Sequence, residues 1–298
     1  MSAAEITHWV SLGLVGDFLP GLTPVNVAGQ RLMVLEDRGQ LSTFSRDCPH
    51  RGADLSRGGL LQGNTVKCRF HGRVIGLGAN LATCASVPEF STSTLGSIVV
   101  ALLGGSDAGF GEHAEGLRQQ CTFLEVGSTA VAAPAELVTE NAFDAEHFCS
   151  VHEVKWIDPI ATSLAESGAL VGRTSFGVPR MPWQSESIGT GVLPLEAIAF
   201  GPYLVVSRVG VDPDHYWVIT ATRPISAASC IVDQTLAFPR TTKTYGAQRL
   251  RQYLVERTRM GLAADLEIWE TMNHEVEPSV NGEQPSVLAF RRYCGLLP

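Results

Sequence analysis

The sequence predicts an α+β protein of two domains, in which a small all-β domain precedes an antiparallel sheet flanked by helices. Short β-rich runs separated by Gly and Pro occupy roughly the first hundred residues. A break rich in glycine and acidic residues follows, and the rest of the chain mixes strands with two helical segments. With 298 residues, 45% of them hydrophobic, the chain is long enough to bury ample core.

In the first domain, which we expect over residues 8–105, strands are predicted at Arg31–Leu35, Val66–Arg69 and Ile98–Leu103. The break at Gly104–Gly116 has the composition of a connecting segment. We therefore expect residues 106–121 to be a linker or surface loop.

The second domain, expected over residues 122–298, contains two segments with helical character, Ala135–His152 and Gln248–Met272. Between them lie the β-rich runs Tyr203–Val209, His215–Thr222 and Ser229–Phe238, several of which end in Pro or Asp turns. Consecutive strands with flanking helices predict an antiparallel sheet with helices on one face.

Charge and hydropathy exclude some partners. The formal net charge of -8 argues against nucleic acid, because phosphate binding favours a basic surface. No apolar run approaches the roughly 20 residues that span a bilayer, and Met1–Ile6 lacks the features of a signal peptide. We expect a cytoplasmic protein without a membrane span. Of its seven cysteines, the five other than Cys48 and Cys68 are expected to be buried free thiols.

The strongest chemical signal is a repeated pairing of one cysteine with one histidine. Cys48-Pro-His50 is followed after a spacer by Cys68-Arg-Phe-His71. A [2Fe-2S] cluster with two thiolates on one iron and two imidazoles on the other needs this set. Glycines follow each loop, at positions where backbone N–H groups approach the cluster sulfurs. A Cys2His2 zinc site is the alternative.

A second cluster of ligand-type residues lies in the first helical segment. His147 and His152 are five residues apart, which on a regular helix separates them by about 140°. Both can face one metal only if the helix bulges or ends between them. Asp144 precedes His147 by one turn and shares its face. A histidine pair on an amphipathic helix is more often structural, so a third ligand is needed.

Asp265 is the candidate third ligand. It lies in the second helical segment, within an apolar stripe at helical spacing formed by Leu254, Leu262, Leu266 and Trp269. A carboxylate on a buried face is costly unless it is paired or binds a metal. A buried salt bridge to Arg257 or Arg259 is the alternative. Together with His147 and His152, Asp265 completes a two-histidine, one-carboxylate set that leaves open positions on Fe(II).

These motifs resemble a known family. Cys48-Pro-His-Arg-Gly-Ala-Asp-Leu and Cys68-Arg-Phe-His-Gly resemble the two loops of a Rieske domain, and Asp144-x-x-His147-x-x-x-x-His152 resembles the mononuclear iron motif of Rieske non-haem iron oxygenases. Asp265-Leu-Glu-Ile-Trp269 is similar to the segment with the third ligand in the ketosteroid 9α-hydroxylase and related hydroxylase or demethylase branch. The resemblance implies a terminal oxygenase component with a helix-grip-like catalytic domain.

The resemblance also implies roles for individual residues. The [2Fe-2S] cluster is expected on Cys48, His50, Cys68 and His71, and Fe(II) on His147, His152 and Asp265. Asp144 would link an iron-ligating histidine to a Rieske histidine of the neighbouring subunit, which implies a head-to-tail homotrimer. Asn141 is carried over as a second candidate catalytic residue.

The reaction implied by the resemblance is the oxidation of a hydrophobic, polycyclic or aromatic small molecule with O2. Hydroxylation is expected, with demethylation or desaturation as variants. Electrons would come from NAD(P)H through a separate flavin-containing reductase, a ferredoxin, or both. Two alternatives remain open from the residues alone: a Rieske electron-transfer protein and a ligand-binding protein with an inactive second site.

Overall fold

The computed structural model describes residues 8–78, 85–152, 154–177, 191–212, 214–241, 248–274, 276 and 280–297. The N-terminal part contains a six-stranded sheet in the order β1-β10-β9-β4-β3-β2. Its strands are β1 (Trp9–Leu14), β2 (Gly21–Val27), β3 (Gln30–Asp37), β4 (Gln40–Ser45), β9 (Glu89–Leu95) and β10 (Ile98–Leu102). The short 3-10 helix η1 (Val15–Asp17) follows β1. The prediction of a small all-β domain is confirmed here.

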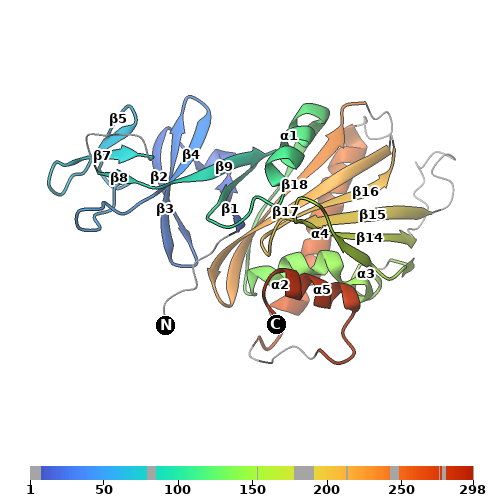
Figure 1. Cartoon of the computed structure of the whole chain (residues 1–298). Coiled ribbons are helices and arrows are strands. Elements are labelled where there is room, and N and C mark those ends of the chain that lie inside the picture. The colour runs from blue at the N-terminus through green and yellow to red at the C-terminus, as the bar shows by residue number, and fades with distance from the viewer. Residues whose placement is uncertain are drawn as a thin grey trace.

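A four-stranded sheet in the order β5-β6-β7-β8 lies at the far end of this domain and carries the second cysteine–histidine loop (Figure 1). Its strands are β5 (Leu60–Gln62), β6 (Thr65–Lys67), β7 (Val74–Leu77) and β8 (Ser86–Val87). A separate hydrophobic cluster that includes Cys48 and Cys68 packs beneath it. The two loops are therefore anchored by a core of their own.

The C-terminal part is built on an eight-stranded sheet in the order β11-β18-β17-β16-β15-β14-β12, with β13 paired to β14. All of its ladders are antiparallel, as predicted. The strands are β11 (Cys121–Val131), β12 (Trp156–Ile157), β13 (Ala161–Leu164), β14 (Leu170–Gly177), β15 (Val192–Ala199), β16 (Leu204–Val211), β17 (Asp214–Ser226) and β18 (Ser229–Pro239).

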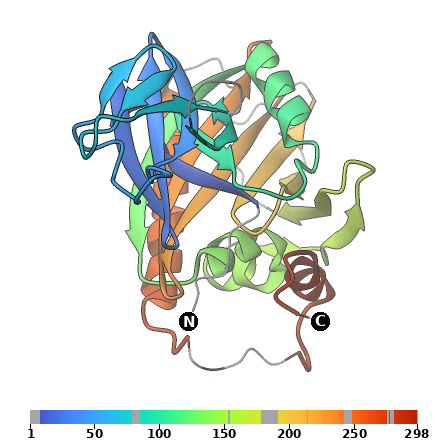
Figure 2. The same ribbon diagram turned by 60° about the vertical axis from the view of Figure 1, so that its left-hand side comes forward.

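Helices cover both faces of this sheet (Figures 1 and 2). They are α1 (Phe110–Gln120), α2 (Ala135–Glu140), η2 (Asn141–Phe143), α3 (Ala145–Ser150), α4 (Gln248–Trp269) and α5 (Pro285–Tyr293). Because side chains alternate along a strand, one face of β16 and β18 packs on α1 and the N-terminal domain. The opposite face packs on α2, α4 and the η2–α5 pair. The prediction that helices lie on only one face of the sheet is therefore incomplete.

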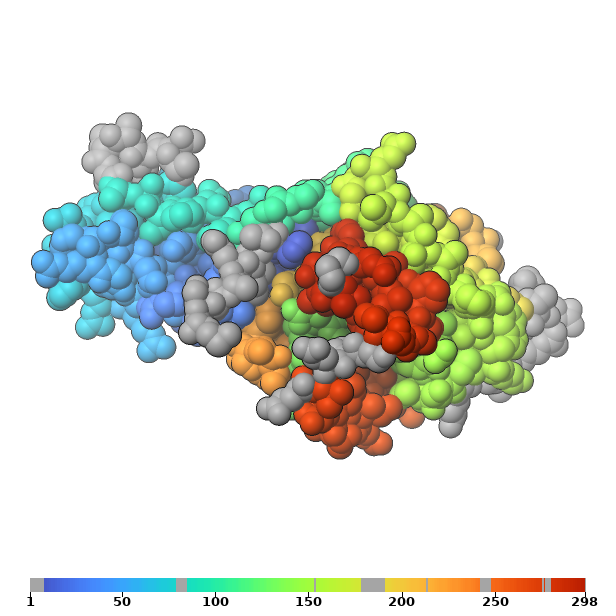
Figure 3. All heavy atoms as spheres, turned by 60° about the horizontal axis from the view of Figure 1, so that its bottom comes forward, coloured from blue at the N-terminus to red at the C-terminus, as the bar shows by residue number. Residues whose placement is uncertain are grey.

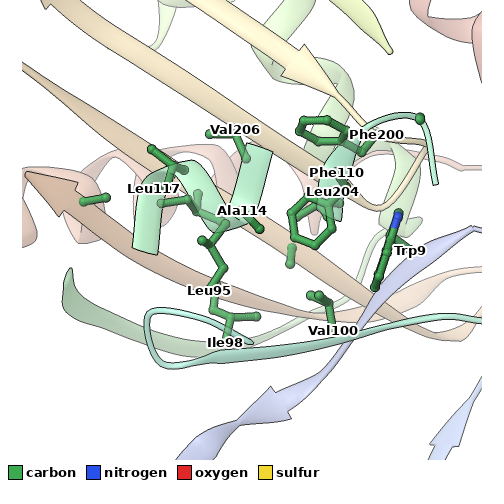
Figure 4. Packing of buried hydrophobic residues seen from close by; sticks show 14 of the residues in the cluster. Trp9, Leu95, Ile98, Val100, Phe110, Ala114, Leu117, Phe200, Leu204 and Val206 are labelled. Atoms are coloured by element: carbon green, nitrogen blue, oxygen red, sulfur yellow. The ribbon is translucent and has the colours of Figure 1, made fainter. Parts of the chain in front are cut away.

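The expectation of a linker or surface loop over residues 106–121 is wrong for most of this segment, because residues 110–120 form helix α1. Phe110, Ala114 and Leu117 recur at helical spacing and are buried between the two sheets. The Phe110 ring lies 4.7 Å from Trp9 and 5.2 Å from Phe200, centroid to centroid (Figure 4). This segment therefore joins the domains as shared core. The domain boundaries expected from the sequence, 8–105 and 122–298, stay predictions.

The helix predicted over Ala135–His152 is divided into α2, η2 and α3. Asp144 has an extended backbone (φ -101°, ψ 100°), which ends the first turn, and its carboxylate caps the next helix. Aspartate is strongly preferred at this N-cap position. The second predicted helix, Gln248–Met272, is confirmed as α4, which ends at Trp269.

The described cysteines are all free. Cys121 and Cys230 are buried as expected, whereas Cys149 is exposed and Cys294 is half-buried. Cys84 lies outside the described residues. None of the helices in the described part of the chain has the length together with the apolar composition that a membrane span requires.

Candidate metal centres

The two cysteine–histidine loops have the same backbone geometry. In the first, the Gly52 N–H donates to the Cys48 carbonyl (2.8 Å); in the second, the Gly72 N–H donates to the Cys68 carbonyl (2.9 Å). Both glycines have a positive φ, 67° and 68°, which is the conformation that glycine adopts without strain. A return bond from the cysteine N–H closes each loop, to Ala53 and Arg73 respectively.

The four candidate cluster ligands separate by burial. The Cys48 and Cys68 side chains are buried beneath the loops, with only 3% and 2% of each residue exposed. The His50 and His71 rings lie 4.8 Å apart, nearly perpendicular to one another, and His71 is exposed. Two buried thiols together with a half-buried and an exposed imidazole fit a cluster that has thiolates on one iron and imidazoles on the other.

A single zinc ion is the alternative for these four residues. A tetrahedral zinc site brings all of its ligand atoms to within about 4 Å of one another. In the described part of the chain, the one group of three or more metal-capable side chains close enough to share an ion is His147, His152 and Asp265. The four loop residues are not such a group, as expected if they are shared between the two irons of a cluster.

The side chains of His147 on α3, His152 just after it and Asp265 on α4 converge on one point, which we call the metal point. Their nearest ligand atoms all lie within 4.8 Å of one another. The two Nε2 atoms are 3.1 Å apart, and His152 Nε2 lies 3.3 Å from Asp265 Oδ1. Ligands bound at about 2.1 Å on neighbouring positions of one ion are separated by roughly 3 Å. The donor set therefore fits a divalent metal ion such as Fe(II).

The end of α3 solves the spacing problem of the two histidines. The helix stops at Ser150, so His152 lies beyond its last turn and can face the same point as His147. Asp265 reaches this point from α4, where Gly261 stands one turn earlier. A Cβ at Gly261 would lie 3.7 Å from the His152 ring, so the helix approaches the imidazole closely.

Hydrogen bonding prepares His147 as a ligand. Its Nδ1–H donates to the Asp144 carbonyl at 2.7 Å, which leaves the lone pair on Nε2, facing the metal point. Burial lowers the pKa of the His147 imidazole, and the Asp144 hydrogen bond opposes that shift only in part. The neutral, metal-binding form of the ring is therefore favoured.

The arginine alternative for Asp265 is not realised among the described residues. Arg259 donates to the Val126 carbonyl (2.7 Å) and to Glu256 (2.8 Å), while Arg257 is exposed. The ionic contact of Asp265 is with His152, and its side chain is 12% exposed. This half-buried carboxylate thus lies next to imidazoles rather than next to a permanent cation.

Asp144 lies beside the metal point and is heavily hydrogen-bonded. Its Oδ1 accepts from the N–H groups of Glu146 (3.0 Å) and His147 (3.2 Å), and from Gln284 Nε2 (2.5 Å). Asn141 begins the turn before it, and the Asn141 carbonyl accepts the Asp144 N–H at 3.3 Å. Asn141 is not part of the group that converges on the metal point.

The sequence interpretation missed two contributors to this region. Phe148 follows His147 and packs against both histidines, and its ring stacks 6.5 Å from Phe176 of β14. This pair forms an aromatic wall beside the metal point. Gln284 is the other missed residue, and no local sequence pattern connects it to Asp144, which lies 140 positions earlier.

Comparisons with known proteins agree with this arrangement. Residues 8–96 match the Rieske [2Fe-2S] domain, and residues 112–294 match the 3-ketosteroid 9alpha-hydroxylase C-terminal domain. Pheophorbide a oxygenase of Arabidopsis thaliana is 34% identical over 89 residues, which cover 29% of this chain. The oxygenase component of 3-ketosteroid-9-alpha-monooxygenase from Rhodococcus rhodochrous is 40% identical over 65 residues, which cover 21% of this chain. Each match spans only 16% of the relative.

Solved structures share the fold along nearly the whole chain. Dicamba monooxygenase bound to dicamba superimposes with a TM-score of 0.67 at 15% identity, covering 97% of this chain and 96% of that one. NdmB of Pseudomonas putida CBB5 gives a TM-score of 0.68 at 15% identity, covering 97% of this chain and 89% of that one. At such identity the likeness concerns the fold alone. The C-terminal family match covers more than half of the sequence, and the chain therefore belongs to the family that joins a Rieske [2Fe-2S] domain to a 3-ketosteroid 9α-hydroxylase C-terminal domain.

Proposed function

We propose that the protein is the terminal oxygenase of a cytoplasmic Rieske non-haem iron system. The observation that carries the proposal is the convergence of His147, His152 and Asp265 on one point beside an aromatic wall. Two imidazoles and one carboxylate leave positions open on Fe(II), where the bound ion supplies reductive activation of O2. We assign the [2Fe-2S] cluster to Cys48, Cys68 and the two loop histidines.

The proposed reaction is the insertion of oxygen into a C–H bond of a hydrophobic, polycyclic or aromatic small molecule. Each hydroxylation consumes one O2, two electrons and two protons, and releases one water. The electrons come from NAD(P)H through a separate flavin-containing reductase, with or without a ferredoxin. Demethylation or desaturation would follow from which C–H bond the pocket presents. The names of the relatives, which include a ketosteroid monooxygenase, support this substrate class.

The residues around the metal point have distinct tasks in this proposal. His147 is held in one tautomer by the Asp144 carbonyl. Phe148 and Phe176 offer apolar surface for a substrate and limit the access of water. We propose that the Asp144 carboxylate connects the centres by binding a Rieske histidine of the neighbouring subunit, and that Asn141 supports the turn that carries it.

Two other functions explain the structure less well. An electron-transfer protein that uses only the Rieske centre has no use for three converging ligands at the other end of the chain. A ligand-binding protein with an inactive second site would be expected to lack a ligand, yet all three side chains meet within 4.8 Å.

We further propose that the protein acts as a head-to-tail homotrimer. Within one chain, the loops between β4 and β7 and helix α3 lie at opposite ends of the molecule (Figure 1). A short electron route to the metal point therefore requires the Rieske loops of another copy.

Charge complementarity supports this contact. Residues 51–73 contain Arg51, Arg57, Lys67, Arg69 and Arg73 against the single acid Asp54, in a chain whose net charge is -8. These five cations are all exposed around the cluster loops. Asp144 and the exposed Glu146 on α3 offer an acidic counterpart.

Sedimentation analysis tests the trimer. Arg69→Glu should weaken association, and the loss should grow at low salt, where electrostatic attraction contributes most. Arg38→Glu is the matched control, because Arg38 is 94% exposed on the hairpin between β3 and β4. Equal association of both variants and the wild type would remove the charged contact from the proposal.

The oxygenase reaction is tested with 18O2. Purified protein, a flavin-containing reductase and NADH would be supplied with a panel of ketosteroids and polycyclic aromatic compounds. We expect one 18O atom in each hydroxylated product, and NADH consumption that depends on the substrate. Product that carries oxygen from water instead would contradict the proposal.

A further inference from the structure

We infer that Gln284 is a positioning residue for electron transfer, because its side-chain amide fixes the Asp144 carboxylate in the orientation that meets the neighbouring Rieske loops. The inference rests on the proposed function and adds a residue to it. Gln284 lies on the segment before α5, far in sequence from the ligands His147 and His152. Its side-chain hydrogen bonds among the described residues go to Asp144 and Ala145, not to a metal ligand.

Both ends of the Gln284 amide are engaged at the start of α3. Its Oε1 accepts the Ala145 N–H at 2.9 Å, and its Nε2 donates to Asp144 Oδ1 at 2.5 Å. The Ala145 N–H needs the amide oxygen as its acceptor, and the Asp144 carboxylate needs the amide NH2 as its donor. Only one orientation of the amide satisfies both contacts, so the side chain is fixed in its rotation as well as its place.

Gln284 completes the hydrogen bonding of the turn that carries His147. The Glu146 and His147 N–H groups donate to Asp144 Oδ1, and the Ala145 N–H donates to Gln284. All three first-turn donors of α3 are thereby satisfied. His147 is in turn fixed by the Asp144 carbonyl. A change at Gln284 would therefore act on the carboxylate first and on the histidine through it.

The carboxylate is held asymmetrically. Among the described residues, the hydrogen bonds of the Asp144 side chain all go to Oδ1. Three donors on one oxygen fix the carboxylate plane and leave Oδ2 for a donor from another chain. An imidazole N–H of a neighbouring Rieske loop is such a donor. Without the Gln284 NH2, the two remaining bonds are the longer ones, 3.0 and 3.2 Å.

Helix α5 keeps Gln284 in place. Arg291 on this helix makes two hydrogen bonds to Glu140 of α2, both at 2.7 Å. Phe290 is fully buried and stacks 5.1 Å from Phe143 of η2. In Figure 3, α5 forms the red ridge on this face and lies against the yellow-green surface that includes β13. The helix that presents Gln284 is therefore anchored to the segment that carries Asp144.

The test uses Gln284→Glu, which keeps an acceptor for the Ala145 N–H and replaces the donor to Asp144 by a repelling oxygen. Gln284→Leu removes both contacts, and Gln252→Glu, on the exposed side of α4, is the matched control. Iron content and the Rieske spectrum are measured first and should equal the wild type in all three variants.

Two readouts then follow on pre-reduced, fully loaded protein. On mixing with O2 and substrate, the oxidation of the Rieske centre should slow by at least about tenfold in Gln284→Glu and Gln284→Leu, a typical loss for a residue that orients ligands from the outer shell. In Gln284→Leu, which adds no charge, the midpoint potential of the Rieske centre, from an EPR-monitored titration without O2, should shift upward, because a displaced Asp144 no longer stabilises the oxidised cluster. The control should match the wild type in both.

The outcomes separate the inference from the proposed function. If both variants match the wild type in oxidation rate and potential, Gln284 does not position Asp144 and the inference is wrong. If the wild-type Rieske centre is itself not oxidised by O2 and substrate, the proposed function fails. A slow rate together with lost iron would assign Gln284 to the stability of α3 instead and would overturn the inference.

Discussion

Replacing Arg291 with leucine removes the cation that neutralises the buried Glu140 carboxylate. The two side chains are only 11% and 9% exposed and share two hydrogen bonds of 2.7 Å. Breaking a buried pair of this kind leaves an uncompensated charge, which costs about 3–5 kcal/mol. We expect that loss in the free energy of unfolding of Arg291→Leu, measured by urea denaturation.

A matched control isolates the buried contact. Glu283 also approaches Arg291, but at 3.4 Å and with 25% of its side chain exposed. Glu283→Gln should therefore cost less than about 1 kcal/mol. The double variant Glu140→Leu/Arg291→Leu removes both charges and should be more stable than Arg291→Leu alone. Destabilisation of less than about 1 kcal/mol in Arg291→Leu would refute the reasoning.

The pH dependence gives a second check on the same variant. Burial raises the pKa of the Glu140 carboxyl, and the hydrogen bonds from Arg291 oppose that rise. Without the cation the pKa rises further. A carboxyl with a raised folded-state pKa favours the folded state most below its unfolded pKa, and this stability falls as the pH rises through the interval between the two values. The destabilisation should thus be smaller at about pH 5 than at about pH 8, and a loss independent of pH would contradict it.

Three further substitutions test the candidate sites. Asp265→Ala should lose the mononuclear iron and product formation while keeping the Rieske spectrum. The control is Glu267→Ala, at an exposed position of the same helix. Normal turnover by Asp265→Ala would remove Asp265 from the ligand set. Asp144→Asn should bind both kinds of iron yet slow Rieske oxidation by at least about tenfold in stopped-flow measurements, and a wild-type rate would remove the bridge. Gly59→Ala should prevent cluster assembly, seen as lost visible absorbance, because a Cβ there would collide with the Leu55 carbonyl and the Val66 side chain. Gly16→Ala has open space and should leave the absorbance unchanged.

The sequence was most informative where chemistry depends on short spacing. The two cysteine–histidine loops and the position of Asp265 on an apolar stripe could be read directly, because each depends on residues within a few turns. His152 was predicted to share a site with His147 only if the helix bulged or ended between them. The structure shows the second of these, with α3 ending at Ser150.

The misjudged elements involve competing local signals or distant contacts. The glycines and acids of the α1 segment predict a loop and mask the helical spacing of Phe110, Ala114 and Leu117. The periodic pattern over Ala135–His152 does not predict the end of the helix at Asp144, because an N-capping aspartate cannot be distinguished by pattern from an aspartate within a helix. Helix α5, with Gln284 and Arg291, could not be placed, because its partners lie 139 to 151 positions away in the chain.

The central claim is that one chain holds two different iron centres. Iron and acid-labile sulfide per chain, determined on anaerobically purified protein, test it most directly. We predict about three irons and two sulfides, from one two-iron cluster and one mononuclear ion. About two of each would leave an electron carrier or an empty second site, and zinc without sulfide would contradict the assignment of both centres.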